Sequence, residues 1–324
     1  VDRGKRAVVL EVSSHGLALK RVEGIPFHAA VFSNLTRDHL DFHGTWEQYF
    51  AAKAQLFENM PEDGVAVVNL DDPMAAKLIR RTRARVLTYG YDQAAQVRLR
   101  QVEPAPSGAI LSFDTPLGPL TTEAHLAGGF NHYNTMAALA TGLALELDPR
   151  AVCGGVASLK NVPGRFERIA EGQNFEVIVD YAHTPDALQR VLQAAREMGT
   201  QRLICVFGCG GDRDRGKRAL MGEVAGELAE LTVLTSDNPR SEDPTRIIAD
   251  IAAGVAKARE FHSEVDREQA IGFALAEARK GDIVVIAGKG HESTQELSNS
   301  VISFDDREVA RRALRLLLAG EERP

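Results

Sequence analysis

The chain has 324 residues, of which 44% are hydrophobic and 26% are charged, as expected for a folded globular protein of about two domains. Its formal net charge of -7 argues against a general nucleic-acid binder, because affinity for a phosphate backbone requires an excess of clustered Lys and Arg. Composition therefore favours small-molecule chemistry, with no nucleic acid as a partner.

Alternating apolar and amphipathic segments predict an α/β architecture for the first half of the chain. Buried strands are predicted at 7–12, 29–34 and 65–70, and a helix is predicted at 45–60 after an N-capping Thr45. From about residue 86 to residue 127 the pattern becomes β-like and rich in loops, which indicates an antiparallel extension.

A further helix is predicted to begin near FNHYN, residues 130–134. The turn-forming segment Asn161-Val162-Pro163-Gly164 is the predicted boundary between two domains. This boundary gives a first domain of residues 1–163 and a second domain of residues 164–324.

The second half repeats a strand and helix pattern. Strands are predicted at 176–180, 202–208, 231–237 and 282–290, with helical segments such as 185–199 and 243–258 between them. This alternation predicts a doubly wound parallel sheet. Ligands of such sheets bind beyond the carboxyl ends of the strands, so the residues after each strand are candidates for a site.

Four strand exits are therefore expected to share one rim: DYAHTPD (180–186), GCGGDRDRGKR (208–218), SDNPRSEDP (236–244) and GKGHE (288–292). They carry Asp180, His183, Arg213, Asp237, Asn238, Arg240 and Glu292. Mixed charge fits a small zwitterion, because an arginine fork takes a carboxylate and acidic side chains take an ammonium group. Taken singly, DNPR is equally consistent with a simple turn and GGDRDRG with a solvated loop.

The stretch GGDRDRGKR resembles a phosphate-binding loop at first sight. The pattern G-x-x-x-x-G-K-[ST] requires a hydroxyl after the lysine to ligate magnesium, and Arg218 occupies that position. We therefore expect residues 211–218 to serve another purpose.

Cysteine usage and hydropathy indicate the compartment. Cys153, Cys205 and Cys209 have neither disulfide nor zinc-ligand spacing, which suits a reducing cytosol. No run approaches the roughly 18 apolar residues of a membrane span, and no signal-peptide pattern precedes the first predicted strand. We expect a cytoplasmic protein with no membrane partner. The start without Met, directly before an apolar run, is typical of a fragment of a longer protein.

Eight motifs carry a resemblance to a known family. They are EVSSHGLALKRVEG, NLTRDHLDFHGTWEQYFAAKAQLF, FNHYN, GRFE, DYAHTPDAL, FGCGGDRDRGKR, SDNPRSEDP and AGKGHE, in this order between residues 11 and 292. The set resembles the MurE-type Mur ligases, ATP-dependent enzymes of peptidoglycan synthesis that support cell shape and division. The resemblance implies part of a central, P-loop ATPase-like domain followed by a Rossmann-like domain that binds the incoming amino acid.

The family has an N-terminal uridine-binding domain and a phosphate loop of the TGTNGKT kind before EVSSHG, and residues 1–324 contain neither. This absence predicts a truncated chain that binds meso-diaminopimelate weakly and shows no turnover. An inactive binder is therefore one alternative function. A folylpolyglutamate-type ligase is another, although that group is not expected to have DNPR followed by GKGHE.

The resemblance implies a magnesium site and a modified lysine in the first domain. Glu11 and His39 match the family's magnesium ligands, although magnesium prefers oxygen ligands to histidine. The spacing from His39 to His43 suits zinc only on a regular helix, which Asp41 and Gly44 disfavour. Lys53 matches a lysine that the family carbamylates. The alternative for Lys53 is a surface lysine with a buried stem.

The same resemblance assigns the substrates. Ser13 and Arg21 match positions that hold UDP-N-acetylmuramoyl-L-alanyl-D-glutamate, while Leu19 replaces a frequent glutamine. Asn131 and Asn134 match adenine contacts of ATP, although Asn at a helix start is more often a cap. Arg165, Asp180 and His183 match phosphate and ribose contacts.

The DNPR motif implies that the added amino acid is meso-diaminopimelate, whose distal carbon carries an ammonium and a carboxylate. Arg213 and Arg240 are the predicted carboxylate partners. Asp237, Glu292 and the Gly288 carbonyl are the predicted ammonium partners, and Asn238 and Pro239 complete the motif. Lysine lacks the second carboxylate, so it would leave an arginine unpaired and be rejected about 10⁴-fold or more.

Overall fold

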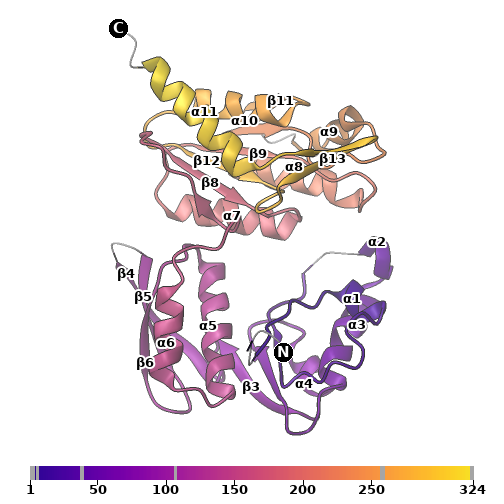
Figure 1. The fold of residues 1–324 in the computed structure, drawn as a ribbon, viewed down its shortest axis with the longest axis vertical. Helices are drawn as coiled ribbons and strands as arrows, with labels where there is room; N and C mark the ends of the chain where they lie inside the picture. Colours follow the sequence, from indigo (N-terminus) through magenta and orange to yellow (C-terminus); the bar gives the residue numbers. More distant parts are fainter. Residues whose placement is uncertain (1–3, 5–6, 37–39, 106–107, 256–259, 322–324) are drawn as a thin grey trace. The chain divides into compact units, whose positions relative to one another are not determined.

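The computed structural model describes residues 4, 7–36, 40–105, 108–255 and 260–321 (Figure 1). Contacts within the chain divide it into two compact units. Unit 1 comprises Val1–Glu123 and Tyr133–Ala157, and unit 2 comprises Ala124–His132 and Ser158–Pro324. The predicted domain boundary at 163 and 164 stays a prediction.

In the first half of the chain the elements are α1 (Ser14–Ala18), β1 (Ala29–Phe32), α2 (Leu40–His43), α3 (Trp46–Glu58), β2 (Val65–Asn69), α4 (Ala75–Ile79), β3 (Arg85–Gly90), β4 (Val97–Ala105), β5 (Gly108–Asp114), β6 (Leu120–Ala124), α5 (Gly129–Ala144) and α6 (Pro149–Ser158). Their strands form one sheet in the order β1-β2-β3-β4-β5-β6. The β1, β2, β3 and β4 strands pair in parallel, and β4 pairs with β5 antiparallel. The predicted antiparallel extension is confirmed.

Helix α3 forms where its sequence predicts it. The Oγ1 atom of Thr45 accepts the backbone N–H of Gln48 at 3.2 Å, which satisfies one of the donors left open at a helix start. The helix buries Phe50 and Phe57 against apolar side chains of β1 and β2, among them Val68. The predicted helix at 45–60 and the predicted strands at 29–34 and 65–70 are therefore confirmed, with ends that differ by a few residues.

The strand predicted at 7–12 is wrong. These residues have no regular structure, and Val8 and Val9 are 85% and 100% exposed. A strand requires a neighbouring strand to pair its backbone and a packed face to cover its side chains. Among the described residues β1 pairs only with β2, so the apolar run has no partner strand.

In the second half the elements are β7 (Glu167–Arg168), β8 (Glu176–Asp180), α7 (Pro185–Glu197), β9 (Leu203–Phe207), α8 (Gly216–Leu228), β10 (Leu231–Leu234), α9 (Pro244–Ala252), β11 (Glu260–Ser263), α10 (Arg267–Glu277), β12 (Ile283–Ala287), β13 (Thr294–Leu297), β14 (Ser300–Ser303) and α11 (Asp306–Glu321). Their main sheet has the order β11-β10-β9-β12-β8-β7, and β13 and β14 form a separate hairpin. All pairs of the main sheet are parallel except β7 with β8.

This sheet is covered on both faces. Side chains of α7, α8 and α9 pack with Leu203, Cys205 and Phe207 in one apolar cluster. Side chains of α10 and α11 pack with Ile204 and Val206 in another. Successive side chains of β9 thus enter opposite layers, as the two-residue period of a strand requires. The predicted doubly wound α/β sheet is confirmed (Figure 1).

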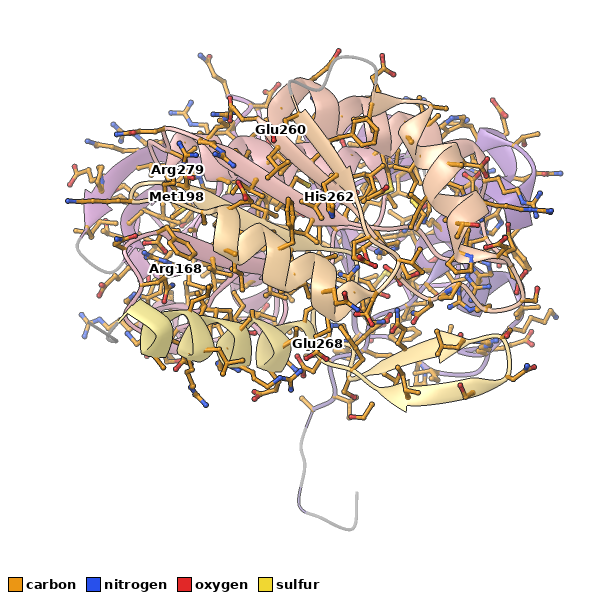
Figure 2. The ribbon with its side chains drawn as sticks, turned by 90° about the horizontal axis from the view of Figure 1, so that it is seen from above. Arg168, Met198, Glu260, His262, Glu268 and Arg279 are labelled. Carbon is orange, nitrogen blue, oxygen red and sulfur yellow. The ribbon has the colours of Figure 1, made fainter. Side chains whose placement is uncertain are left out.

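Strand β11 forms one edge of this sheet and lies beside α10. His262 of β11 stacks on Phe273 of α10 with ring centroids 4.0 Å apart, and Figure 2 labels His262 on the edge strand. Within the described part of the chain, no helix has the length and apolar character needed to cross a membrane.

Candidate functional site

The exits of β10 and β12 meet in a polar cluster in unit 2. The Nδ2 atom of Asn238 donates to Oε2 of Glu292 at 3.0 Å. The Nζ atom of Lys289 donates to the same Glu292 oxygen and to Oδ1 of Asn238, each at 3.0 Å. Lys289 has no exposed surface, so its ammonium group is held by these two acceptors from within the protein. The cluster joins the DNPR and GKGHE motifs directly.

The charge state of Glu292 follows from this arrangement. Burial favours the neutral carboxyl, but the hydrogen-bonded Lys289 ammonium and its charge outweigh this effect and lower the pKa of Glu292 below its ordinary value. The hydroxyl of Tyr181 and the amide of Asn238 also hydrogen-bond to the carboxylate. Glu292 therefore presents a negative charge near the strand exits at neutral pH.

Two glycines allow the exit loops to approach closely. Gly288 has a φ of +117°, and a Cβ added there would lie 2.6 Å from Oδ2 of Asp237. A Cβ at Gly211 would lie 1.9 Å from the carbonyl oxygen of Pro239. The exits of β9 and β10 therefore approach each other backbone to backbone at Gly211, and the exit of β12 at Gly288 lies against the Asp237 side chain.

Arg240 lies at the end of the DNPR motif with a φ of +51°. Its Nε donates to Oε2 of Glu296 at 2.6 Å, and one terminal nitrogen donates to the carbonyl of Gly211 at 2.9 Å. The carbonyl of Asn238 lies 3.5 Å from the same terminal nitrogen. Arg213, by contrast, is exposed and donates to the adjacent Asp212 carbonyl at 2.9 Å.

Side chains of residues 211–218 form hydrogen bonds with the segments that follow β8 and β10. Arg218 is 1% exposed and donates to both oxygens of Glu242, at 2.9 and 3.1 Å, and to Asp250 at 2.9 Å. The hydrogen bonds from Arg218 lower the pKa of Glu242 to about 2. Lys217 donates to the carbonyl of His183 at 2.7 Å. These contacts give residues 211–218 a structural role, and the expectation that they are not a phosphate loop stays a prediction.

The exit of β8 is tied to the turn that contains GRFE. The two carboxylate oxygens of Asp180 accept the backbone N–H groups of Phe166 and Ala182, each at 2.7 Å. Burial nevertheless raises the pKa of Asp180. The Arg165 guanidinium lies over the Tyr181 ring, 4.6 Å from its centroid.

His183 lies beside these residues. Its Nδ1 is 2.9 Å from the Tyr181 carbonyl oxygen, and the two rings pack edge to face. The nucleotide-contact roles expected for Arg165, Asp180 and His183 stay predictions.

A buried ion pair lies behind the strand exits. Arg267 and Asp306 have fully buried side chains and form two hydrogen bonds of 2.8 Å. The remaining donors of Arg267 reach the carbonyls of Ser236 at 3.1 Å and Ala287 at 2.9 Å. These carbonyls directly precede Asp237 and Gly288, so the arginine sets the spacing between the β10 and β12 exits.

Unit 1 contains the candidate residues Glu11, Ser13, Arg21 and Lys53. Glu11, Ser13 and Arg21 are exposed, and the Ser13 hydroxyl accepts the backbone N–H of Gly16 at 3.0 Å as the cap of α1. Lys53 is half-buried, with its Nζ 5.4 Å from the centroid of the Tyr49 ring. Its carbamylation stays a prediction, as do the substrate contacts of Ser13 and Arg21.

His39 lies outside the described residues, so the predicted magnesium pair of Glu11 and His39 stays a prediction. His43 is buried, and its Nε2 lies 2.9 Å from the Ser14 hydroxyl. Among the residues that the structure describes, no three His, Cys, Asp or Glu side chains gather to hold a metal ion.

The asparagines of FNHYN lie in the first turns of α5. Asn131 is buried, and its amide donates to the carbonyl of Ala127 at 2.7 Å, while Asn134 is exposed. A local role at the start of the helix also explains this hydrogen bond of Asn131. Adenine recognition by both residues stays a prediction.

A cavity of about 530 Å³ lies at the other end of the sheet in unit 2. It is lined near the amino ends of β8 and β12 by residues that include Glu176, Asp282 and Ile283, and by Arg168 and Met198, which Figure 2 labels. Arg168 is already paired with Glu176. Because ligands of parallel sheets bind at the carboxyl ends of the strands, we do not assign the site to this cavity.

Sequence patterns missed several residues of the site. Lys289 stands inside the quoted motif GKGHE, and its position between two glycines after an apolar strand was a usable signal. Arg267, Glu296 and Asp306 lie outside every quoted motif. Only the tertiary structure brings these three residues to the strand exits.

A doubly wound α/β unit with oppositely charged side chains at its strand exits belongs to the class of small-ligand-binding α/β proteins. Two family models refine this class: the Mur ligase middle domain matches residues 1–142, and the Mur ligase, glutamate ligase domain matches residues 164–290. The chain belongs to the Mur ligase family, which confirms the resemblance inferred from its motifs.

Known proteins with similar sequences and folds support this family assignment. A protein of Solibacter usitatus (strain Ellin6076), named UDP-N-acetylmuramoyl-L-alanyl-D-glutamate--2,6-diaminopimelate ligase, is 51% identical over 317 residues, which cover 96% of this chain and 64% of that protein. A solved structure of a ligase with the same name is 40% identical, with a TM-score of 0.62 over 98% of this chain and 66% of that one.

A Mycobacterium tuberculosis folylpolyglutamate synthase, solved with ADP and AMPPCP, has a TM-score of 0.69 at 22% identity, over 91% of this chain and 64% of that one. This likeness shows a shared fold alone. The chain thus spans somewhat less than two thirds of the length of the relatives described here.

Proposed function

We propose that this protein is an ATP-dependent amide ligase that adds meso-2,6-diaminopimelate to UDP-N-acetylmuramoyl-L-alanyl-D-glutamate in peptidoglycan synthesis. The observation that carries the proposal is the junction of the DNPR and GKGHE motifs through Asn238, Lys289 and Glu292. Relatives that are named for this activity support the choice of substrates. A cytoplasmic location goes with the proposal, because ATP and UDP-linked precursors occur there.

The strand exits of unit 2 form the amino-acid site in this proposal. Glu292 and Asp237 are the anionic groups that would attract the distal ammonium, together with the carbonyl of Gly288. Arg240 and the exposed Arg213 are the cationic groups that would take the distal carboxylate. Opposite charges on neighbouring loops match the two charges on the distal carbon of the ligand.

The reaction that we propose proceeds through an acyl phosphate. A carboxylate oxygen of the muramoyl dipeptide attacks the γ-phosphorus of ATP, and ADP leaves. The deprotonated amine of diaminopimelate then attacks the acyl carbon, and phosphate leaves as the amide forms. Mg²⁺ would neutralise charge on the phosphoryl oxygens. We propose Glu11 and His39 as its ligands, a carbamylated Lys53 as their neighbour, and Ser13 and Arg21 as contacts of the muramoyl peptide.

Nucleotide contacts are proposed on two motifs. Asn131 and Asn134 would contact adenine, and Arg165, Asp180 and His183 would contact the phosphates and ribose. The Tyr181 ring supports the Arg165 guanidinium on one side, and its hydroxyl reaches Glu292. Within unit 2, Tyr181 therefore connects the proposed phosphate contact Arg165 with the proposed amino-acid contact Glu292.

Replacing Arg240 by Ala should weaken binding of meso-diaminopimelate by about 10- to 100-fold, because a hydrogen bond to a charged group contributes about 1.5–3 kcal/mol. Isothermal titration calorimetry with the free amino acid measures this change. The control is Arg246→Ala, which removes an arginine that is 86% exposed on the nearby helix α9. Equal affinity in the two variants would remove Arg240 from the proposed site.

A chain that binds diaminopimelate without catalysing its ligation is the second candidate function. No G-x-x-x-x-G-K-[ST] sequence occurs in residues 1–324, and phosphoryl transfer depends on groups that position the nucleotide phosphates. We therefore expect background phosphate release when these 324 residues are supplied with ATP, Mg²⁺ and both substrates. Turnover above background would reject the binding-only alternative and establish the ligase directly.

A further inference from the structure

Arg240 is paired with a carboxylate of the protein itself. Its Nε donates to Glu296 Oε2 at 2.6 Å, and the two side chains are 22% and 45% exposed. A second donor position is used by the Gly211 carbonyl at 2.9 Å. A carboxylate binds an arginine most strongly through two parallel hydrogen bonds. Glu296 occupies the single N–H of Nε, so a second carboxylate cannot form such a pair at the Nε edge while Glu296 is bound there.

Glu296 is held in this place by its backbone. Its N–H donates to Oδ1 of Asn238 at 3.0 Å, and its carbonyl accepts the N–H of Arg240 at 3.2 Å. The residue belongs to β13, whose neighbour Gln295 donates to the carbonyl of Asp237 at 2.7 Å. The hairpin is thus docked on the DNPR loop by one hydrogen bond between backbone groups and two between a backbone group and a side chain, none of which uses the partly exposed Glu296 carboxylate.

We propose that Glu296 is a specificity-determining residue whose carboxylate competes with the distal carboxylate of the amino-acid ligand for Arg240. This inference rests on the proposed function, because it requires Arg240 to bind that ligand. A ligand with a distal carboxylate displaces Glu296, and the ligand carboxylate then forms the ion pair with Arg240. A ligand without one leaves the pair between Glu296 and Arg240 intact.

The competition has a consequence for selectivity. Rejection of an analogue by about 10⁴-fold depends on leaving a buried polar group unpaired when the analogue binds. Lysine does not leave Arg240 unpaired here, because Glu296 already satisfies it. The protein therefore discriminates between diaminopimelate and lysine less strongly than an isolated arginine would.

The test is calorimetric binding of meso-diaminopimelate and of L-lysine to the unmodified chain and to Glu296→Gln. The amide keeps the shape and the backbone contacts but removes the competing charge. Diaminopimelate should bind about three- to fivefold more tightly to the variant, the range expected for loss of a partly exposed ion pair. Lysine should bind no more tightly than before, so the ratio of the two affinities should rise.

Two controls complete the design. Glu268→Gln breaks an ion pair with Arg312 in which both side chains are 55% exposed, and it should leave both affinities unchanged (Figure 2). In an Arg240→Ala background, Glu296→Gln should have no effect on diaminopimelate binding, because the guanidinium for which the two carboxylates compete is absent. Thermal unfolding of each variant checks that the fold is kept.

The outcomes separate the inference from the function on which it rests. Weaker diaminopimelate binding by Glu296→Gln would mean that Glu296 aligns Arg240 for the ligand, and unchanged binding would mean that no competition occurs. Either result overturns the inference. Failure of the unmodified chain to bind diaminopimelate, or equal binding by Arg240→Ala and the unmodified chain, would instead overturn the proposed amino-acid site.

Discussion

Replacement of Arg267 by Met is expected to lower the free energy of unfolding by about 3–5 kcal/mol, the loss found when one partner of a buried ion pair is removed. The variant leaves the Asp306 carboxylate buried without its cation. It also removes the donors to the carbonyls of Ser236 and Ala287. The exits of β10 and β12 would then lose their common support.

Urea unfolding of Arg267→Met measures this loss, with Arg312→Met as the matched control. Arg312 pairs with Glu268 on the surface, where an ion pair contributes about 0–1 kcal/mol. The double variant Arg267→Met/Asp306→Leu should recover part of the stability, because it removes the unpaired charge as well. A loss in Arg267→Met no larger than that in Arg312→Met would show that the buried pair is not a support of the fold.

Replacement of Gly211 by Ala should weaken both the fold and the proposed site. The new Cβ would lie 1.9 Å from the Pro239 carbonyl oxygen and 2.8 Å from the Pro239 carbonyl carbon, so one loop has to move. Overpacking of this kind costs about 1–3 kcal/mol. Since the Gly211 carbonyl also accepts from Arg240, the same movement should disturb the arginine and reduce diaminopimelate affinity.

Gly272→Ala is the control for this prediction. Gly272 lies within α10, and an added Cβ there meets no atom within 4 Å. Alanine in a helix interior is favoured over glycine by about 0.8–1.0 kcal/mol, so this variant should be neutral or more stable. Chemical unfolding and calorimetric titration of both variants give the comparison. A Gly211→Ala chain as stable as Gly272→Ala, with unchanged affinity, would contradict the close approach of the two loops.

Local patterns predicted most of the architecture of unit 2. The strands β8, β9, β10 and β12 coincide with apolar runs seen in the sequence, because strands buried on both faces require unbroken apolar segments. Their parallel pairing follows from the helices between them. Because ligands of such sheets bind beyond the carboxyl ends of the strands, DNPR and GKGHE were expected to lie together, and Asn238 and Glu292 join them by a hydrogen bond.

The same reasoning was wrong for residues 7–12. Five of these six residues are apolar, but Val9 is fully exposed, whereas Val285 of β12 is fully buried. A strand depends on backbone partners that come from other parts of the chain, and β12 has β8 and β9 on its two sides. Composition indicates that a segment can form a strand, while the presence of neighbours decides whether it does.

By itself, the sequence determined the strands β8, β9, β10 and β12 of unit 2, its doubly wound sheet and the family, since each depends on local residue patterns and their order. The partners of the charged side chains were decided only by the tertiary structure. Lys289 is buried between Asn238 and Glu292, and Arg240 is paired with Glu296, 56 residues further along the chain. Lys289 and Glu292 lie in one loop, but the pairs of Lys289 with Asn238 and of Arg240 with Glu296 join loops that are distant in sequence, so no local period or spacing encodes them.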